Sequence, residues 1–142
     1  MSLSGCDVLL ENQAKGPIAI AEAAGELQVV VCIDAEADAI AMGERPKGEA
    51  WFEFWRVDAP VELEAGDEVF GAVSEAGLRP QGVAPGLNPG DLILVQLIGD
   101  GSTGIMPPQA GFVVPEDGMP EEGWLHPDDS VTANPCDGLN TE

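Results

Sequence analysis

The chain has 142 residues, of which 26 are Asp or Glu and five are Lys or Arg, so its formal net charge is −21. From residue 80 to the end there is no Lys or Arg, so the carboxylates of that region must be solvated, neutralised by cations or matched by a basic partner. A charge of this sign opposes binding to nucleic acid and to an anionic membrane surface, and we expect neither as a partner.

The composition predicts an all-β fold. Hydrophobic residues make up 44% of the chain, which is enough for a core, while 18 Gly and 12 Pro are unfavourable in helix interiors. No window approaches the roughly 20 apolar residues of a membrane span, and the first residues, MSLSGCDVLL, lack the features of a secretory signal. We therefore expect synthesis in the cytoplasm.

Residues 1–16 are predicted to be an N-terminal arm, followed over residues 17–99 by a small antiparallel barrel or sandwich. The Ala-rich run PIAIAEAAG fits a short helix or a strand followed by a turn. Residues 27–33 form an apolar, β-branched run typical of a buried strand. Residues 34–42 alternate acidic residues with Ala, and we interpret them as a solvated loop or a single helical turn.

The segment AWFEFWRV at residues 50–57 is the strongest aromatic cluster of the chain. Strict strand alternation assigns its side chains to two faces: Trp51, Glu53 and Trp55 on one, Phe52, Phe54 and Arg56 on the other. The cluster suits either a core strand or an exposed platform for stacking carbohydrate. The pattern favours the core.

Two later segments, residues 61–73 and 87–98, each place a Gly-Asp pair just before an apolar run. This pattern predicts entry into a strand of a tight antiparallel structure. The intervening SEAGLRPQG is interpreted as a hairpin tip with Gly77 at the turn.

Residues 100–142 are predicted to form an extended, acidic, Pro-rich C-terminal arm, because they combine many turn residues with no long periodic run. Apolar residues recur along it, and we interpret five of them as partner-binding anchors: Ile105, Met106, Phe112, Trp124 and Leu125. Such an arm either wraps its own domain or becomes ordered against a neighbour.

The sequence offers little that indicates catalysis, a cofactor or a metal, and we expect no enzyme activity and no bound cofactor or metal ion. His126 is the one histidine, and its setting HPDD suggests a solvated turn. The three cysteines have wide, unpatterned spacing, which argues against a disulfide framework and a zinc site. Cys32 is expected to be a small core residue; Cys6 and Cys136 could pair if the termini meet, although free thiols are the default.

The order of features over residues 17–98 resembles that of small phage capsid decoration, or cement, proteins. The segment VELEAGDEVF at residues 61–70 and the closing strand LILVQLI carry the resemblance most clearly. The resemblance implies a non-enzymatic virion protein that binds the major capsid protein at capsomer junctions, commonly as a trimer, and braces the head. It supplies no catalytic or metal-binding residues, and the long C-terminal segment and the acidity depart from its pattern.

Three other hypotheses fit the composition. An acidic β-sandwich that binds carbohydrate would expose Trp51 or Trp55, and a nucleic-acid mimic would bind a basic DNA-binding protein in a salt-sensitive way. A protein adapted to a saline habitat would fold only in high salt.

Overall fold

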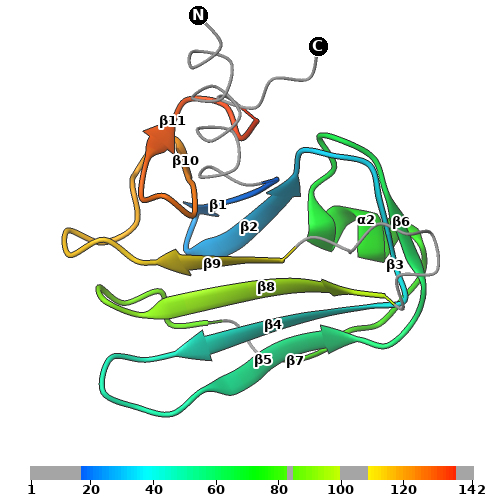
Figure 1. The fold of residues 1–142 in the computed structure, drawn as a ribbon, viewed down its shortest axis with the longest axis horizontal. Helices are drawn as coiled ribbons and strands as arrows, with labels where there is room; N and C mark the ends of the chain where they lie inside the picture. The colour runs from blue at the N-terminus through cyan, green and yellow to red at the C-terminus, as the bar shows by residue number, and fades with distance from the viewer. Residues whose placement is uncertain (1–16, 83–84, 100–108, 137–142) are drawn as a thin grey trace, which may run out of the picture.

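The computed structural model describes residues 17–82, 85–99 and 109–136, and it confirms the mainly β fold. All strand pairs are antiparallel, and they form a four-stranded sheet, a five-stranded sheet and a two-stranded ribbon (Figure 1). Among the described residues the strands do not close into a barrel. Of the two architectures that the sequence left open, the sheets therefore fit the open, sandwich-like one.

The four-stranded sheet has the order β11-β10-β1-β2. Its strands are β1 (Ile18–Ala23), β2 (Glu26–Val31), β10 (Trp124–Leu125) and β11 (Val131–Thr132). The ambiguous Ala-rich run is the strand β1. A tight turn follows it, in which Ala24 and Gly25 both have positive φ, 53° and 80°, as in the hairpin turns that suit the twist of antiparallel strands.

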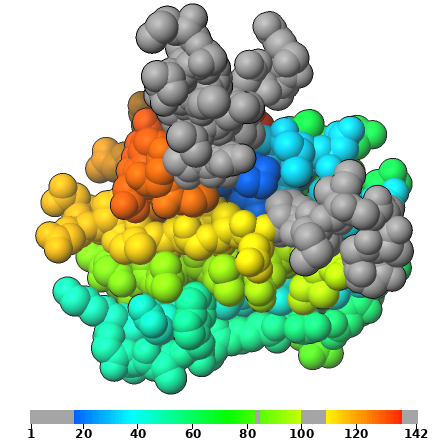
Figure 2. Space-filling view, viewed as in Figure 1, coloured from blue at the N-terminus to red at the C-terminus, as the bar shows by residue number. Residues whose placement is uncertain are grey.

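The five-stranded sheet has the order β7-β5-β4-β8-β9. Its strands are β4 (Ala39–Arg45), β5 (Phe52–Val57), β7 (Gln81–Gly82), β8 (Leu92–Ile98) and β9 (Gln109–Val113). In the space-filling view the bands of β9, β8, β4 and β5 lie side by side across one face of the molecule (Figure 2).

One core joins the two large sheets, because side chains of both belong to a single buried cluster. Ile20, Val29 and Leu125 come from the four-stranded sheet, and Met42 and Phe112 come from the five-stranded sheet. Residues 109–136 thus supply three strands and part of the core. Over these residues, the segment expected to be an extended arm is part of the folded domain.

Residues 34–42 were predicted to be a loop or a helical turn, and this prediction is wrong. They form β3 (Ala35–Ala37) and the first part of β4. β3 pairs with β6 (Val61–Leu63) to form the two-stranded ribbon, and β4 pairs with β5 and β8. Tertiary pairing outweighs the low strand propensity of Ala, Asp and Glu here.

The strand predicted after the first Gly-Asp pair is instead the short helix α2 (Val69–Glu75), which packs against β2 and β6. The Glu68 carboxylate caps it by accepting hydrogen bonds from the backbone N–H groups of Phe70 and Gly71, both at 3.1 Å. Gly77, predicted to lie in a hairpin turn, instead follows the helix end with φ of 75°, a usual role for glycine.

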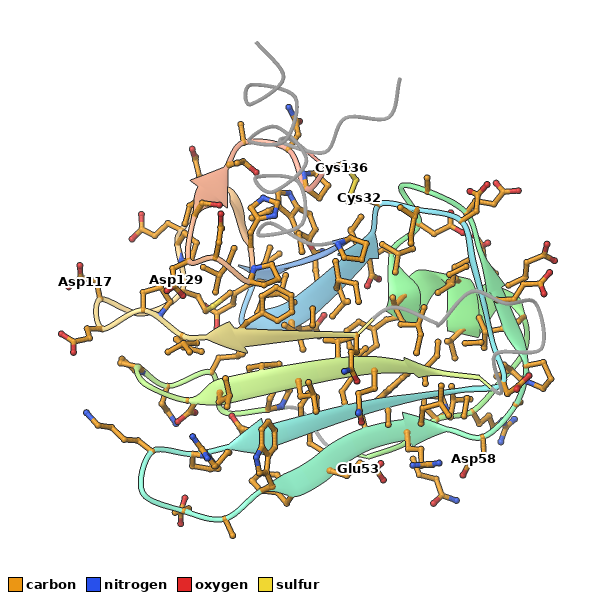
Figure 3. All side chains as sticks on the ribbon, viewed as in Figure 1. Cys32, Glu53, Asp58, Asp117, Asp129 and Cys136 are labelled. Atoms are coloured by element: carbon orange, nitrogen blue, oxygen red, sulfur yellow. A yellow bond between two sulfur atoms is a disulfide. The ribbon has the colours of Figure 1, made fainter. Side chains whose placement is uncertain are left out.

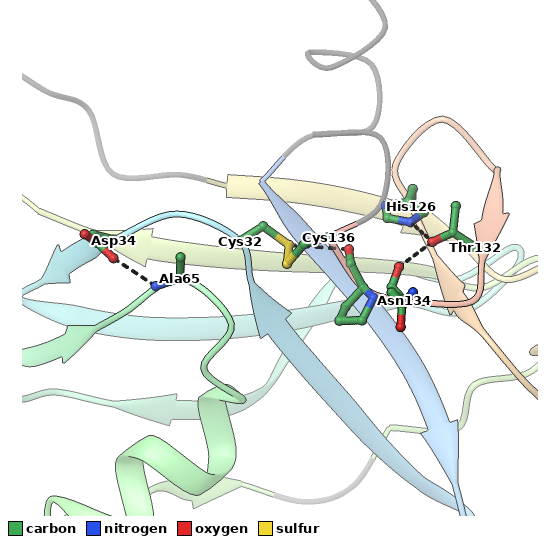
Figure 4. Close-up of a disulfide and its surroundings, with 8 residues drawn as sticks. Cys32, Asp34, Ala65, His126, Thr132, Asn134 and Cys136 are labelled. Carbon is green, nitrogen blue, oxygen red and sulfur yellow. Dashed lines mark hydrogen bonds between the residues drawn. A yellow bond between two sulfur atoms is a disulfide. The ribbon is translucent and has the colours of Figure 1, made fainter. Parts of the chain in front are cut away.

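A disulfide joins Cys32, just after β2, to Cys136 (Figure 4), so the expectation of free thiols is wrong for this pair. Their Cα atoms lie 5.4 Å apart although 104 residues separate them in sequence. Pairing of β10 with β1 brings the chain back to the four-stranded sheet and makes this contact possible. Cys32 is buried, as expected, and Cys6 lies outside the described residues.

Candidate interaction surface

The three predicted anchor residues that the structure describes do not form one exposed surface. Phe112 and Leu125 are fully buried in the core, and Trp124 in β10 is partly buried. Ile105 and Met106 lie outside the described residues. Since Phe112 and Leu125 have no exposed surface to offer, their role in the described structure is to stabilise the fold.

The aromatic segment at residues 51–55 is divided between core and surface. A β-bulge opposite Met42 and Gly43 breaks the strict alternation, so that Phe54 and Trp55 are both buried. Trp55 makes an edge-to-face contact with Phe70, with ring centroids 5.1 Å apart. Trp51 and Phe52 remain 43% and 45% exposed. The favoured core interpretation is therefore right for one half of the cluster and wrong for the other.

The strand register shows which side chains of the five-stranded sheet point away from the core. We call this set the outer face: Ala39, Ala41, Gly43 and Arg45 on β4, Trp51, Glu53 and Arg56 on or beside β5, Leu92, Leu94, Gln96 and Ile98 on β8, and Gln109, Gly111 and Val113 on β9. Leu92, Leu94 and Ile98 are partly exposed, and Val113 is 47% exposed, whereas Ala39 and Ala41 on β4 are covered by their neighbours and buried. The outer face is thus largely apolar.

The outer face also differs from the rest of the chain in charge. It carries Arg45, Arg56 and one carboxylate, Glu53, and this carboxylate accepts a hydrogen bond of 2.9 Å from Arg56. Arg56 also donates to Asp58 at 2.6 Å, at the end of β5 (Figure 3). The hydrogen bonds to Asp58 and Glu53 keep the pKa of Arg56 above its ordinary value. In a chain of net charge −21, this sheet face is close to neutral.

Trp51 lies against Gly43 of β4 at one end of the outer face. A Cβ placed on Gly43 would come within 3.4 Å of the Trp51 ring, so glycine leaves room for the indole. The Arg45 guanidinium lies 6.0 Å from the ring centroid on the same strand, at the limit of a cation–π contact. Trp and Arg dominate the residues that anchor protein–protein contacts, so this pair is the strongest candidate anchor on the described surface.

Two buried carboxyl groups lie below this end of the sheet. Glu44 and Asp91 are each only 3% exposed. Glu44 accepts from the Gly86 N–H at 3.1 Å, and Asp91 accepts from the N–H groups of Lys47 and Asn88 at 3.3 and 2.9 Å. Burial, together with a hydrogen bond and repulsion from Asp91, raises the pKa of Glu44. The pair holds two turns together, at residues 46–49 and 86–90.

His126 is buried, so the prediction of a solvated turn is wrong for this residue. The Thr132 hydroxyl donates to the Asn134 carbonyl at 2.6 Å, and therefore accepts at 2.7 Å from Nε2 of His126 (Figure 4). This chain of hydrogen bonds fixes the hairpin of β10 and β11, whose turn includes Asp129 at a φ of 71°.

Two hollows flank the edge formed by β5 and β7. One of about 480 Å³ is lined by residues that include Arg56, Asp58 and Arg79, and one of about 360 Å³ by residues that include Trp55 and Phe70.

Within residues 17–82, 85–99 and 109–136, no group of three or more His, Cys, Asp or Glu side chains is arranged to hold a metal ion. The same residues contain no helix of the length and apolar character needed to cross a membrane.

No family model, curated protein or solved structure matches this chain. Of the residues on the outer face, only Trp51 was predicted from the sequence as a possible surface residue. A signal for the others was present in LILVQLI, because a strand that is apolar at consecutive positions is apolar on both of its faces.

Proposed function

We propose that this chain is a virion structural protein, a capsid decoration protein that stabilises a phage head by binding the major capsid protein at capsomer junctions. The observation that supports it best is the outer face, an apolar and nearly neutral sheet surface on a strongly acidic protein. Apolar surface with a Trp–Arg anchor is typical of protein contact sites. The proposed activity is assembly, without a chemical reaction.

The carboxylates outside the outer face also support the proposed role as a capsid decoration protein. Outside the outer face, exposed carboxylates lie on the four-stranded sheet, on the two-stranded ribbon and on α2, for example Glu26, Glu36 and Glu75. A high net charge on the outside of a particle keeps particles apart in solution. The disulfide is also compatible with the surface of a released virion, which is an oxidising setting.

The test is binding of the purified chain to phage heads that lack it, read by electron microscopy and by the protein that sediments with the heads. We expect saturable binding in a fixed ratio to the major capsid protein, and heads that withstand heating or chelation better than bare heads. Trp51→Ala should weaken this binding at least tenfold. Absence of saturable binding by the folded protein would contradict the proposal.

Carbohydrate binding is the second candidate, because Trp51 is 43% exposed. A stacking platform needs an open ring face, and the Arg45 guanidinium lies over the Trp51 ring, 6.0 Å from its centroid. This geometry favours a protein contact. A saturable change of Trp fluorescence with an oligosaccharide, lost in Trp51→Ala, would favour the second candidate.

A further inference from the structure

We propose that the hollow between the edge of β2 and the start of α2 binds an extended segment of a partner protein, which places a Lys or Arg side chain in it. We call this hollow of about 360 Å³ the edge groove. Its lining includes Leu27, Phe54, Trp55, Glu68 and Phe70. None of the described residues that line it belongs to the outer face, so the inference goes beyond the proposed function.

The backbone of β2 is the first argument, because β2 is an edge strand of the four-stranded sheet. The N–H of Val29 donates to the Glu68 carboxylate at 3.2 Å, so it points away from β1. Leu27 lies two residues earlier in the same strand, and its N–H and C=O groups therefore point the same way. Among the described residues, none makes a hydrogen bond to these two groups. An extended segment can pair with such an open strand edge.

The aromatic lining of the edge groove is the second argument. The rings of Trp55 and Phe70 meet at 88°, with their centroids 5.1 Å apart. In an added antiparallel strand, the side chain opposite Leu27 lies on the same side of the sheet as Leu27, which belongs to the core cluster with Trp55. That side chain would point toward the rings. Aromatic rings attract ammonium and guanidinium groups, and the apolar stem of Lys or Arg packs against them.

Charge is the third argument, and it favours a basic side chain over an apolar one. The Glu68 carboxylate lines the groove. It accepts hydrogen bonds from the backbone N–H groups of Val29, Phe70 and Gly71 at 3.2, 3.1 and 3.1 Å, which hold it in place and leave acceptor capacity for one more donor. Glu26 adds an exposed carboxylate, and none of the described lining residues is Lys or Arg. The net charge of −21 also attracts a basic partner.

The experiment is an NMR titration of the full chain with two short, blocked peptides of alternating Thr and Val. One peptide carries Lys at its centre, and the other carries norleucine, which keeps most of the apolar stem and lacks the charge. We expect saturable binding of the Lys peptide, with the largest backbone amide shifts at Leu27 and Phe70. The norleucine peptide should bind about tenfold more weakly, because it loses the attraction of the rings and the carboxylates for a cation.

Two variants test the part played by the rings. Phe70→Leu keeps an apolar side chain at the groove and removes the ring, and it should lower the preference for the Lys peptide over the norleucine peptide about threefold. Phe52→Leu is the matched control, because Phe52 is a 45% exposed aromatic residue of β5 that does not line the edge groove. It should leave the preference unchanged. Circular dichroism of both variants checks that the fold is retained.

The inference would be overturned by a lack of saturable binding, by equal affinities for the two peptides, or by amide shifts centred outside the edge groove. The same loss of preference in both Leu variants would also overturn it, because attraction to the whole acidic chain would then explain the binding. Each of these outcomes leaves the proposed function standing, since head binding is assigned to the outer face. Conversely, a chain that binds the Lys peptide as described and binds no heads refutes only the proposed function.

Discussion

The two faces of the five-stranded sheet are both apolar, yet they differ in what covers them. On β8 the inward side chains Ile93 and Val95 have no exposed surface, while the adjacent residues Leu92 and Leu94 are partly exposed. Two adjacent residues of β9 show the same difference in exposure, because Phe112 is fully buried and Val113 is 47% exposed. Alternate residues of the same strands thus differ in their surroundings: one set is buried in the core, and the other remains partly accessible to solvent.

The largest expected effect on stability is at the inner face of the five-stranded sheet, which is the face that packs in the core. Phe112→Ala removes a fully buried ring, and we expect it to lower the free energy of unfolding by about 3–5 kcal/mol. Val113→Ala, one residue along the same strand, should cost less than about 1 kcal/mol because the side chain is half exposed. Denaturant unfolding of both variants measures the contrast. Equal costs would show that the outer face is part of the fold-stabilising core.

The next effect on stability concerns the four-stranded sheet, which packs against the inner face of the five-stranded sheet. The disulfide between Cys32 and Cys136 closes a loop of 104 residues, for which the chain-entropy model gives a stabilisation of about 4–5 kcal/mol. We expect Cys136→Ser to lower the unfolding free energy by roughly 2–5 kcal/mol. Reduction of the disulfide in the wild type should lower it by the same amount. Reduced wild type and the variant should then unfold alike; a variant with unchanged stability would mean that the bridge does not constrain the chain.

A smaller effect is expected at the polar end of the inner face. The pKa of Glu44 is raised from its ordinary value of 4.5, so the folded state holds this proton more tightly than the unfolded state. Stability from that proton is present below pH 4.5 and is lost as the pH rises through the higher pKa of the folded state. Glu44→Gln keeps an uncharged donor beside Asp91 and removes the titration.

The stability of Glu44→Gln relative to the wild type should therefore increase as the pH rises through this window. Glu49→Gln is the matched control, because it removes a charge from an exposed position in the adjacent turn, and its difference from the wild type should vary less with pH. Thermal unfolding of the three proteins across the pH range measures both. A difference between Glu44→Gln and wild type that stays constant with pH would contradict a raised pKa.

Much of the mainly β fold could be predicted from the sequence because long apolar runs dominate it. Residues 27–33 and LILVQLI predicted the strands β2 and β8. In the structure β2 pairs with β1 at one edge of its sheet, and β8 lies between β4 and β9. Where the local sequence pattern was weak, tertiary contacts determined the secondary structure. Residues 34–42 became strands through β6 and β8, and residues 69–75 became a helix with Glu68 as its cap.

The candidate surface was harder to predict. Leu94 and Val113 come from strands separated in sequence, and only the register of β8 with β4 and β9 places them on one face with Gly43 and Gly111. The predicted anchors Phe112 and Leu125 were chosen because apolar residues in a Pro-rich segment suggest a docking arm. Long-range pairing of β9 with β8 and of β10 with β1 instead places both in the core.

The most direct test of this division within one sheet is the Leu94→Glu variant, measured for unfolding free energy and for occupancy of phage heads on the same preparation. We predict a change in unfolding free energy of about 1 kcal/mol, as for a partly exposed position outside the core, together with loss of head binding. A large loss of stability would show that the outer face is covered within the monomer. Unchanged stability with full head binding would show that the outer face has no part in assembly.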